Sequence, residues 1–405
     1  MNEKALSTKP TRLQALLACA TIMAGIVLNL AGIDLVLPSV PAMPEIFGTT
    51  VAMSQQVLSA FVAGTTLGLL VFGSLAEHIG RRRLFITSLV TYGLLSFACT
   101  FSTDIWHLII LRFLQGAAAT GAAVLAPGLI RSLFSEHGAM RAIGAMGSIE
   151  SLVPGLAPLA GAWLYKGYGW EASFALTAIL LGIVCLLVVI RPTLIPSIGV
   201  KTHTGKGSYM KLLKNSAYMR YAQGHALTVG GLLTFVFSAP AIIVQTMGGT
   251  IDNFITMQMV GVATFIISAN MASGLAKRFG TETMIMVGTI VCVFSTFILL
   301  AYAIWGANDP THLPALFWVL NTGVGLRAGP GFVMALKAAN GDDDRASALI
   351  ILSITGFAAI ATAVVAPFIQ VGLIALTVTT CLIVLAALVL MLVIPPIKDA
   401  TEAQE

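Results

Sequence analysis

The sequence predicts an all-α membrane protein with twelve transmembrane helices arranged as two parallel repeats of six. The chain has 405 residues, of which 57% are hydrophobic and only 10% are charged, whereas soluble proteins carry about 25% charged residues. The apolar residues gather in twelve stretches of about 20 residues or more, which is the length that a bilayer core requires. A short motif that closes the second stretch also recurs in the second half.

The predicted spans follow one another with short connections, except at residues 192–216. This stretch contains two prolines and four lysines, so we expect a polar linker. It divides the chain into a six-helix bundle at 1–191 and a second bundle with a tail at 217–405. The predicted spans are 14–40, 52–75, 83–101, 106–133, 139–165, 172–191, 217–246, 252–276, 282–305, 312–336, 345–369 and 373–395.

Basic residues occupy every second connection between the spans. Three consecutive arginines follow the second span at 81–83, and Lys277 and Arg278 follow the eighth. The intervening connections carry acids such as Asp104 and Asp252. Because basic loops stay in the cytoplasm, we expect both termini and the linker on that side. The even number of spans agrees.

The two halves of the chain echo each other in sequence. Residues 73–80 read GSLAEHIG and residues 273–280 read SGLAKRFG, each at the end of an even-numbered span. Residues 126–129 (APGL) resemble 329–332 (GPGF) in the same way. Chance matching of small residues is the alternative, but the equivalent location in each half argues against it. Parallel six-span repeats are the build of one large class of transporters.

Three charged residues lie inside apolar stretches: Asp34, Arg112 and Glu150. An ionisable group at the bilayer centre costs about 3 kcal/mol on insertion scales. Two acids and one arginine at this depth therefore indicate an ion or substrate pathway that handles protons. The sequence has no His-rich metal cluster, Ser/His pair or nucleotide loop, so we expect neither an enzyme nor a cofactor, metal or catalytic site. The net charge of +5 sits in short loops and does not indicate nucleic acid.

The segment that ends the second span reads GSLAEHIGRRR from Gly73 onward. It resembles the signature that the major facilitator superfamily carries between its second and third helices. In that family the acid and the bases make charge contacts between helices that gate the inner face, so the resemblance assigns gating roles to Glu77, Arg81 and Arg82. Gly73 permits close helix approach and Gly80 a tight turn. Glu77 stands where aspartate is usual.

Two further motifs resemble the drug/proton antiporters of this superfamily. LIILRFLQG contains Arg112 and is similar to the fourth-span motif of those antiporters, which carries a membrane-embedded arginine. GIDLVLPSVP contains Asp34 and resembles the first span of the bicyclomycin/chloramphenicol-resistance and multidrug-facilitator branch. The resemblance covers essentially the whole chain and implies the family's twelve-helix fold in the inner membrane of a bacterium.

A third motif, LVPGLAPLAGAW, resembles the fifth-span antiporter motif with its usual G-P-x-x-G core. Ala157 replaces the first glycine, while Pro158 and Gly161 remain. Pro154 and Pro158 are four residues apart, so we expect them to bend this helix. The motif favours antiport over symport.

We predict that Asp34 carries the coupling proton and that Arg112 tunes it, and a static Asp34–Arg112 pair is the alternative. Glu150 is a candidate for a second proton site, a counter-charge to Arg112 or a ligand for a cationic substrate. A glutamate that reaches the membrane surface is the alternative for Glu150. Gln115 shares a helix face with Arg112 and is a candidate for lining the cavity or for holding helices together.

In the second half, several polar and aromatic residues are candidates for substrate contact. Each has a packing alternative, because amides in membrane helices often hydrogen-bond between helices. Arg327 would contact an anionic group or a carbonyl-rich break near 329–331, or extend toward the cytoplasmic end. The candidates are Phe235, Phe237, Gln245, Asn270, Asn321 and Arg327.

The function that the sequence predicts is proton-coupled export of lipophilic drugs or small molecules, cationic ones among them, by alternating access. Export of a native metabolite, such as a siderophore, sugar or amino-acid derivative, is the alternative, and import by proton symport is a third. A membrane-embedded enzyme and a non-transporting receptor fit the sequence less well. We expect a monomer whose partners are its substrate, protons and lipid, and no nucleic acid.

Overall fold

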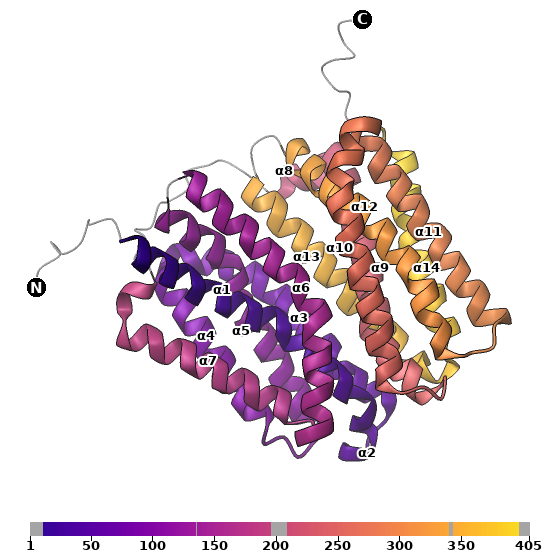
Figure 1. The fold of residues 1–405 in the computed structure, drawn as a ribbon, viewed down its shortest axis with the longest axis horizontal. Helices are drawn as coiled ribbons and strands as arrows, with labels where there is room; N and C mark the ends of the chain where they lie inside the picture. The colour runs from indigo at the N-terminus through magenta and orange to yellow at the C-terminus, as the bar shows by residue number, and fades with distance from the viewer. Residues whose placement is uncertain (1–10, 135, 196–208, 340–342, 397–405) are drawn as a thin grey trace, which may run out of the picture.

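The computed structural model describes residues 11–134, 136–195, 209–339 and 343–396, and this part of the chain is helical without strands. Twelve long helices dominate it (Figure 1). The first six are α1 (Arg12–Asp34), α3 (Val51–Ile79), α4 (Arg81–Cys99), α5 (Ile105–Leu133), α6 (Glu136–Tyr168) and α7 (Ala172–Ile190). The other six are α9 (Ser216–Gln245), α10 (Ile251–Phe279), α11 (Thr281–Trp305), α12 (Leu313–Ala338), α13 (Asp343–Val365) and α14 (Leu373–Val393).

Short helical pieces complete the described chain. Each predicted span overlaps one long helix, although the first extends beyond its helix. Eight helical segments of the described residues are long and apolar enough to cross a membrane. The all-α membrane class is therefore confirmed, while membrane crossing by all twelve helices stays a prediction. The short pieces are η1 (Leu37–Ala42), α2 (Met43–Phe47), η2 (Pro192–Leu194), α8 (Tyr209–Lys214), η3 (Pro310–His312) and η4 (Ala366–Val371).

The first predicted span, 14–40, is not one continuous helix. The α-helix α1 ends at Asp34, and the chain continues as the 3-10 helix η1. Pro38 and Pro41 lie in η1, and a proline has no N–H for the hydrogen-bond ladder of an α-helix. The end of α1 therefore falls at a charged residue in the interior of the protein.

The repeated motif forms the same turn in both halves. The helices before it, α3 and α10, each contain 29 residues. Gly80 and Gly280 then adopt φ angles of +88° and +90°, which only glycine reaches without strain. The next helices, α4 and α11, begin directly after these glycines. The sequence echo therefore corresponds to a structural repeat.

Helices α3 and α5 approach each other closely at two glycines. A Cβ at Gly64 would lie 1.9 Å from the Phe113 carbonyl oxygen, and one at Gly116 would lie 2.0 Å from the Phe61 carbonyl oxygen. Small residues at such crossings are typical of membrane helices, where packing and not hydrophobic burial drives association. The crossing fixes α5, which carries Arg112.

The two halves meet at the end of the molecule where α2 lies, which is opposite to α8 (Figure 1). Gln55 Nε2 donates to the Phe237 carbonyl oxygen (2.8 Å), and Gln245 Nε2 donates to the Pro41 carbonyl oxygen (2.7 Å). Nearer the middle, Thr66 donates to the Thr355 hydroxyl oxygen (2.9 Å). The halves are thus closed against each other at the α2 end.

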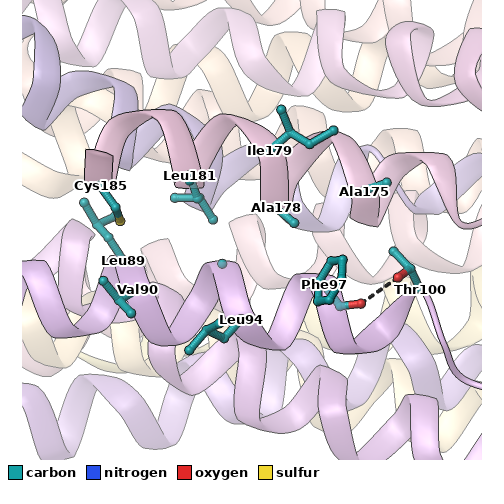
Figure 2. Close-up of a pocket in the computed structure, with 12 residues that line it drawn as sticks. Leu89, Val90, Leu94, Phe97, Thr100, Ala175, Ala178, Ile179, Leu181 and Cys185 are labelled. Atoms are coloured by element: carbon teal, nitrogen blue, oxygen red, sulfur yellow. Dashed lines mark hydrogen bonds between the residues drawn. The ribbon is translucent and has the colours of Figure 1, made fainter. Parts of the chain in front are cut away.

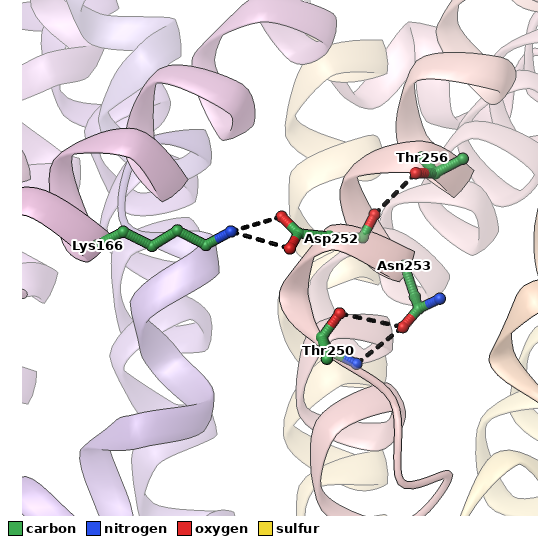
Figure 3. A network of polar contacts seen from close by, with 5 residues as sticks. All are labelled: Lys166, Thr250, Asp252, Asn253 and Thr256. Atoms are coloured by element: carbon green, nitrogen blue, oxygen red, sulfur yellow. Dashed lines mark hydrogen bonds and ion pairs between the residues drawn. The ribbon is translucent and has the colours of Figure 1, made fainter.

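An ion pair also joins the halves at this end. Lys166 Nζ on α6 lies 2.7 Å and 2.9 Å from the two carboxylate oxygens of Asp252 on α10 (Figure 3). Asp252 also belongs to the first turn of α10, whose N-cap Thr250 forms a capping box with Asn253. The side chains of Lys166 and Asp252 are 53% and 65% exposed, so water and salt screen the pair.

We expect a small coupling free energy for the Lys166–Asp252 pair. Exposed ion pairs contribute about 0.2–1 kcal/mol, and that contribution falls with added salt. A double-mutant cycle with Lys166→Ala, Asp252→Ala and the double variant, read by thermal unfolding at low and high salt, measures it. A coupling that exceeds this range and survives high salt would contradict the prediction.

Candidate functional site

Asp34 is the last residue of α1 and lies in the protein interior. Its side chain is only 5% exposed. Within the described part of the chain, its carboxyl group forms neither a hydrogen bond nor an ion pair. A buried carboxyl without a partner is costly when ionised. Asp34 therefore has the surroundings of a group that responds to a proton or to a cationic ligand.

Arg112 reaches from α5 to the backbone of α1 just before Asp34. Its Nη1 atom donates to the Gly32 carbonyl oxygen (3.1 Å), and its Nε atom donates to the Val57 carbonyl oxygen (3.3 Å). The guanidinium group lies 4.1 Å from the ring centroid of Phe61, a cation–π distance. The alternative of a static Asp34–Arg112 ion pair is not what the structure contains. Arg112 instead attaches α5 to the end of α1.

Gln115 continues the Arg112 network into the bundle. Its Oε1 atom accepts from Arg112 Nη1 (2.6 Å), and its Nε2 atom donates to Ser96 Oγ (2.7 Å). Ser96 donates in turn to the Tyr92 carbonyl oxygen (2.7 Å). Gln115 is 1% exposed, which favours helix bonding over a cavity position. Ser96 could not be identified from the sequence, since a serine in an apolar helix is common.

The fifth-span motif packs on the turn that follows Asp34. A Cβ at Gly161 on α6 would lie 2.2 Å from the Leu35 carbonyl oxygen, so only glycine fits there. Ser173 Oγ on α7 donates to the same oxygen (2.9 Å). The motif glycine therefore allows α6 to approach the point where α1 ends.

The two prolines of the motif expose a backbone acceptor. Helix α6 runs through Pro154 and Pro158 without interruption. Because Pro158 has no N–H, the Pro154 carbonyl oxygen lacks its usual partner four residues later. Gln258 Nε2 on α10, in the other half, donates to this oxygen (3.3 Å). The spacing of the prolines thus provides a contact between the halves.

Glu150 is half-buried on α6. In the described residues it forms no ion pair with Arg112 or with any other base. The structure therefore does not bring it into the Arg112 network, and its role stays a prediction.

The gating motif is described at its turn. Arg82 Nη2 donates to the Pro192 carbonyl oxygen (2.6 Å), and Arg81 Nη1 lies 3.1 Å from where a Cβ at Gly128 would be. These contacts tie the turn after α3 to α5 and to the end of the first half. The surroundings of Gly73 and the side chain of Glu77 lie outside the described part.

Three of the second-half candidates make contacts within the second half. Phe235 is buried and stacks on Phe317, with ring centroids 5.1 Å apart. Asn321 Nδ2 donates to the Phe317 carbonyl oxygen (3.0 Å), and Asn270 Nδ2 donates to the Ile266 carbonyl oxygen (2.8 Å). The stacking of Phe235 favours its packing alternative. The two asparagines bond within their own helices and not between helices, and Asn270 is exposed, so their roles stay a prediction.

Phe237 and Gln245 belong to the contact between the halves described above. Arg327 does not extend toward solvent, because it is fully buried on α12 and donates from Nη1 to the Gly224 carbonyl oxygen and to Thr228 Oγ1 on α9. Arg327 therefore contacts a backbone carbonyl group, as one of its predicted roles requires. This carbonyl group belongs to Gly224 on α9 and not to the predicted break near 329–331.

A groove of about 420 Å³ lies between α4 and α7 (Figure 2). Its lining includes Leu94, Phe97 and Ile179, and Gly93 and Gly182 leave it open. The Thr100 hydroxyl at its edge donates to the Phe97 carbonyl oxygen. The groove contains none of the predicted site residues, and its apolar lining suits a lipid chain better than proton chemistry.

Residues 22–363 match the family model described as Major Facilitator Superfamily. The chain belongs to the Major Facilitator Superfamily. It is therefore a multi-pass membrane transporter and not an enzyme, as the motifs predicted.

Curated relatives of this superfamily member include bacterial resistance proteins. A bicyclomycin resistance protein homolog of Haemophilus influenzae is 23% identical over 318 residues, covering 76% of each chain. A chloramphenicol resistance protein of Pseudomonas aeruginosa is 25% identical over 297 residues, covering 72% of this chain and 70% of the relative. The multidrug resistance protein MdtL of Salmonella typhi is 25% identical over 253 residues, covering 61% and 64%. These relatives agree with the predicted branch.

Solved transporter structures share the fold of this superfamily member. The POT family transporter PepTSo aligns with a TM-score of 0.73 at 11% identity, covering 95% of this chain and 97% of its own. The nucleoside transporter NupG aligns with a TM-score of 0.67 at 13% identity, covering 94% and 98%. At these identities the likeness concerns the fold alone.

Proposed function

We propose that this transporter is a proton-coupled exporter of lipophilic small molecules, in the bacterial cytoplasmic membrane with both termini in the cytoplasm. The observation that carries the proposal is the buried carboxyl group of Asp34 at the point where α1 ends, which has no partner among the described residues. A buried acid without a partner favours the protonated form, and a cationic ligand or water favours the ionised form. Asp34 is thus suited to exchange a proton against a substrate.

The surroundings of Asp34 connect its charge to the position of helices. Arg112 holds the α1 backbone at Gly32, and Gly161 brings α6 against Leu35. Asp34 follows Gly32 by two residues on α1, so a movement of this end of α1 on ionisation of Asp34 would reach α5 through the hydrogen bond between Gly32 and Arg112. In alternating access the two six-helix units rock against each other. The segment η1, which follows α1, contacts the other half at Pro41, and α6 contacts it at Pro154.

The identity of the relatives supports the substrate class. Proteins named for resistance to bicyclomycin, to chloramphenicol and to multiple drugs cover most of this chain at 23–25% identity. Removal of such compounds from the cell requires export. Antiport with protons supplies the driving force, and Glu150 is a second acid that would receive a cationic substrate.

Substrate-dependent proton movement tests the proposal. Wild-type protein is placed in proteoliposomes that enclose a pH-sensitive dye, under an imposed pH gradient. Chloramphenicol is the neutral probe and tetraphenylphosphonium the cationic probe. We expect each transported probe to move in the direction opposite to protons. The pH gradient should then dissipate faster than it does in protein-free liposomes.

Two results would contradict antiport. Probe and proton movement in the same direction would indicate symport, and binding of a probe without any flux would indicate a receptor. A protonophore control separates leakage from coupled flux, because it should stop accumulation of a probe that depends on the gradient.

A further inference from the structure

Within the described part of the chain, a buried guanidinium group in the second half forms no ion pair. Arg327 on α12 is fully buried, and its Nη1 atom donates to Gly224 and Thr228 on α9. Its Nε and Nη2 atoms are buried and have no hydrogen-bond partner in the described structure. Buried donors almost always have a hydrogen-bond acceptor, so we expect an acceptor at this edge of the guanidinium group.

A second unpartnered nitrogen atom lies beside this edge. His225 follows Gly224 on α9, is 7% exposed, and its Nδ1 atom also has no partner among the described residues. Gly331 lies on α12 four residues after Arg327, on the same helix face. A Cβ at Gly331 would lie 3.7 Å from Arg327 Nη2 and 3.8 Å from His225 Nδ1. The two nitrogen atoms therefore converge on a glycine.

The nearby carboxylate of Glu282 is already engaged. Glu282 on α11 pairs with Arg220 Nη2 and accepts from the Tyr221 hydroxyl group (2.9 Å). In the described part of the chain, no carboxylate forms an ion pair with Arg327. A buried charge with no compensating partner is strongly destabilising. The site thus lacks one negative group.

We propose that Arg327, His225 and the open face of Gly331 form a binding site for a small carboxylate-type anion. The Nε/Nη2 edge is one along which a guanidinium group binds a carboxylate with two parallel hydrogen bonds. His225 adds a third donor when Nδ1 carries the proton. The absent side chain of Gly331 leaves room for the anion between the two helices.

The carboxylate in this site would come from one of two sources, a free anion or the carboxylate group of a transported molecule. This site lies in the second half, apart from Asp34, and goes beyond the proposed proton coupling. A failure of proton antiport would leave the anion measurement below unchanged, so the two proposals are tested separately.

Formate is the probe for the site. Purified protein is titrated with sodium formate while sodium gluconate keeps the ionic strength constant, and thermal unfolding is followed by tryptophan fluorescence. Binding to the native state alone raises Tm with saturation. We expect a saturable rise in Tm for the wild type, and a half-saturating concentration about tenfold higher or more in Gly331→Ala, because the methyl group displaces the anion from its donors.

Gly329→Ala is the matched control. It makes the same change on the same helix, but a Cβ at Gly329 would meet no atom within 4 Å. We expect its formate titration to match the wild type. In case Gly331→Ala does not fold, Arg327→Lys serves as a second variant, since it keeps the charge and removes the two-donor edge.

The titrations test the anion site, and a transport assay identifies the source of the anion. A wild-type Tm that does not respond to formate would overturn the proposal, and so would an unchanged titration in Gly331→Ala or, where that variant does not fold, in Arg327→Lys. Transport of a carboxylic acid and of its methyl ester then distinguishes the sources. A selective loss of acid transport in Gly331→Ala indicates a cargo carboxylate, and equal transport of both compounds indicates a free anion.

Discussion

Asp34→Asn is expected to reduce transport driven by a pH gradient to the level of protein-free liposomes. The amide has nearly the same shape as the carboxyl group but cannot ionise. Because Asp34 forms no hydrogen bond or ion pair with a described residue, the substitution breaks no contact that holds the fold. We therefore expect normal expression and a Tm within a few degrees of the wild type, measured beside flux in proteoliposomes.

A second assay makes the Asp34→Asn result specific to coupling. Exchange of labelled for unlabelled substrate without a gradient needs no net proton movement, so we expect it to persist. Asp104→Asn is the control, because Asp104 is exposed and caps α5 by accepting from the Trp106 N–H (2.7 Å), and asparagine caps equally well. Full gradient-driven transport in Asp34→Asn would refute the assignment.

Gly116→Ala is expected to be strongly destabilising, as an added methyl group at Gly64 on the same helix crossing would be. A Cβ at Gly116 would lie 2.0 Å from the Phe61 carbonyl oxygen and 3.1 Å from the Phe61 Cα. These are backbone atoms of α3, so no side-chain rotation relieves the clash, and α3 and α5 must separate. Overpacking costs about 1–3 kcal/mol where side chains adjust, and we expect at least the upper value here.

Loss of transport in Gly116→Ala should accompany the loss of stability. The shift of α5 moves Arg112 and Gln115, which lie within four residues of Gly116 and connect α1 to α4. Thermal unfolding and flux are compared with Gly182→Ala on α7, where a Cβ would meet no atom within 4 Å. A Tm of Gly116→Ala equal to that of the control would show that the crossing is not tight.

Much of the architecture was predictable because lipid imposes it on the sequence. Apolar stretches of membrane length are visible without any knowledge of packing, and each overlaps a long helix, although the first, 14–40, extends beyond the end of α1. The turn glycines at 80 and 280 were predictable for a local reason, since a positive φ favours glycine. Asp34 and Arg112 were found because a charge in an apolar stretch is conspicuous.

The partners of these residues could not be predicted in the same way. A hydrogen bond from Arg112 to the Gly32 carbonyl oxygen has no sequence signal, because every residue has a carbonyl group. Ser173 and Ser96 acquire their roles only when α7 and α4 are placed beside the other helices. The end of α1 at Asp34 was not predicted, since the first span was expected to run over 14–40. Prolines such as Pro38 and Pro41 do not decide where a helix ends, because helices with proline also continue, as α6 does.

The closed end of the transporter has an unusual chemical character. Three glutamines, Gln55, Gln245 and Gln258, donate across the halves to main-chain carbonyl groups. Each contact is uncharged on both sides, and none depends on which side chain the accepting residue carries. Substitution of an accepting residue therefore leaves its carbonyl group in place, although the Pro154 oxygen also depends on Pro158. Acidity and salt in the medium leave these three bonds unaltered, so pH and ionic strength act on this end of the molecule through the exposed Lys166–Asp252 pair and not by loosening the amide contacts.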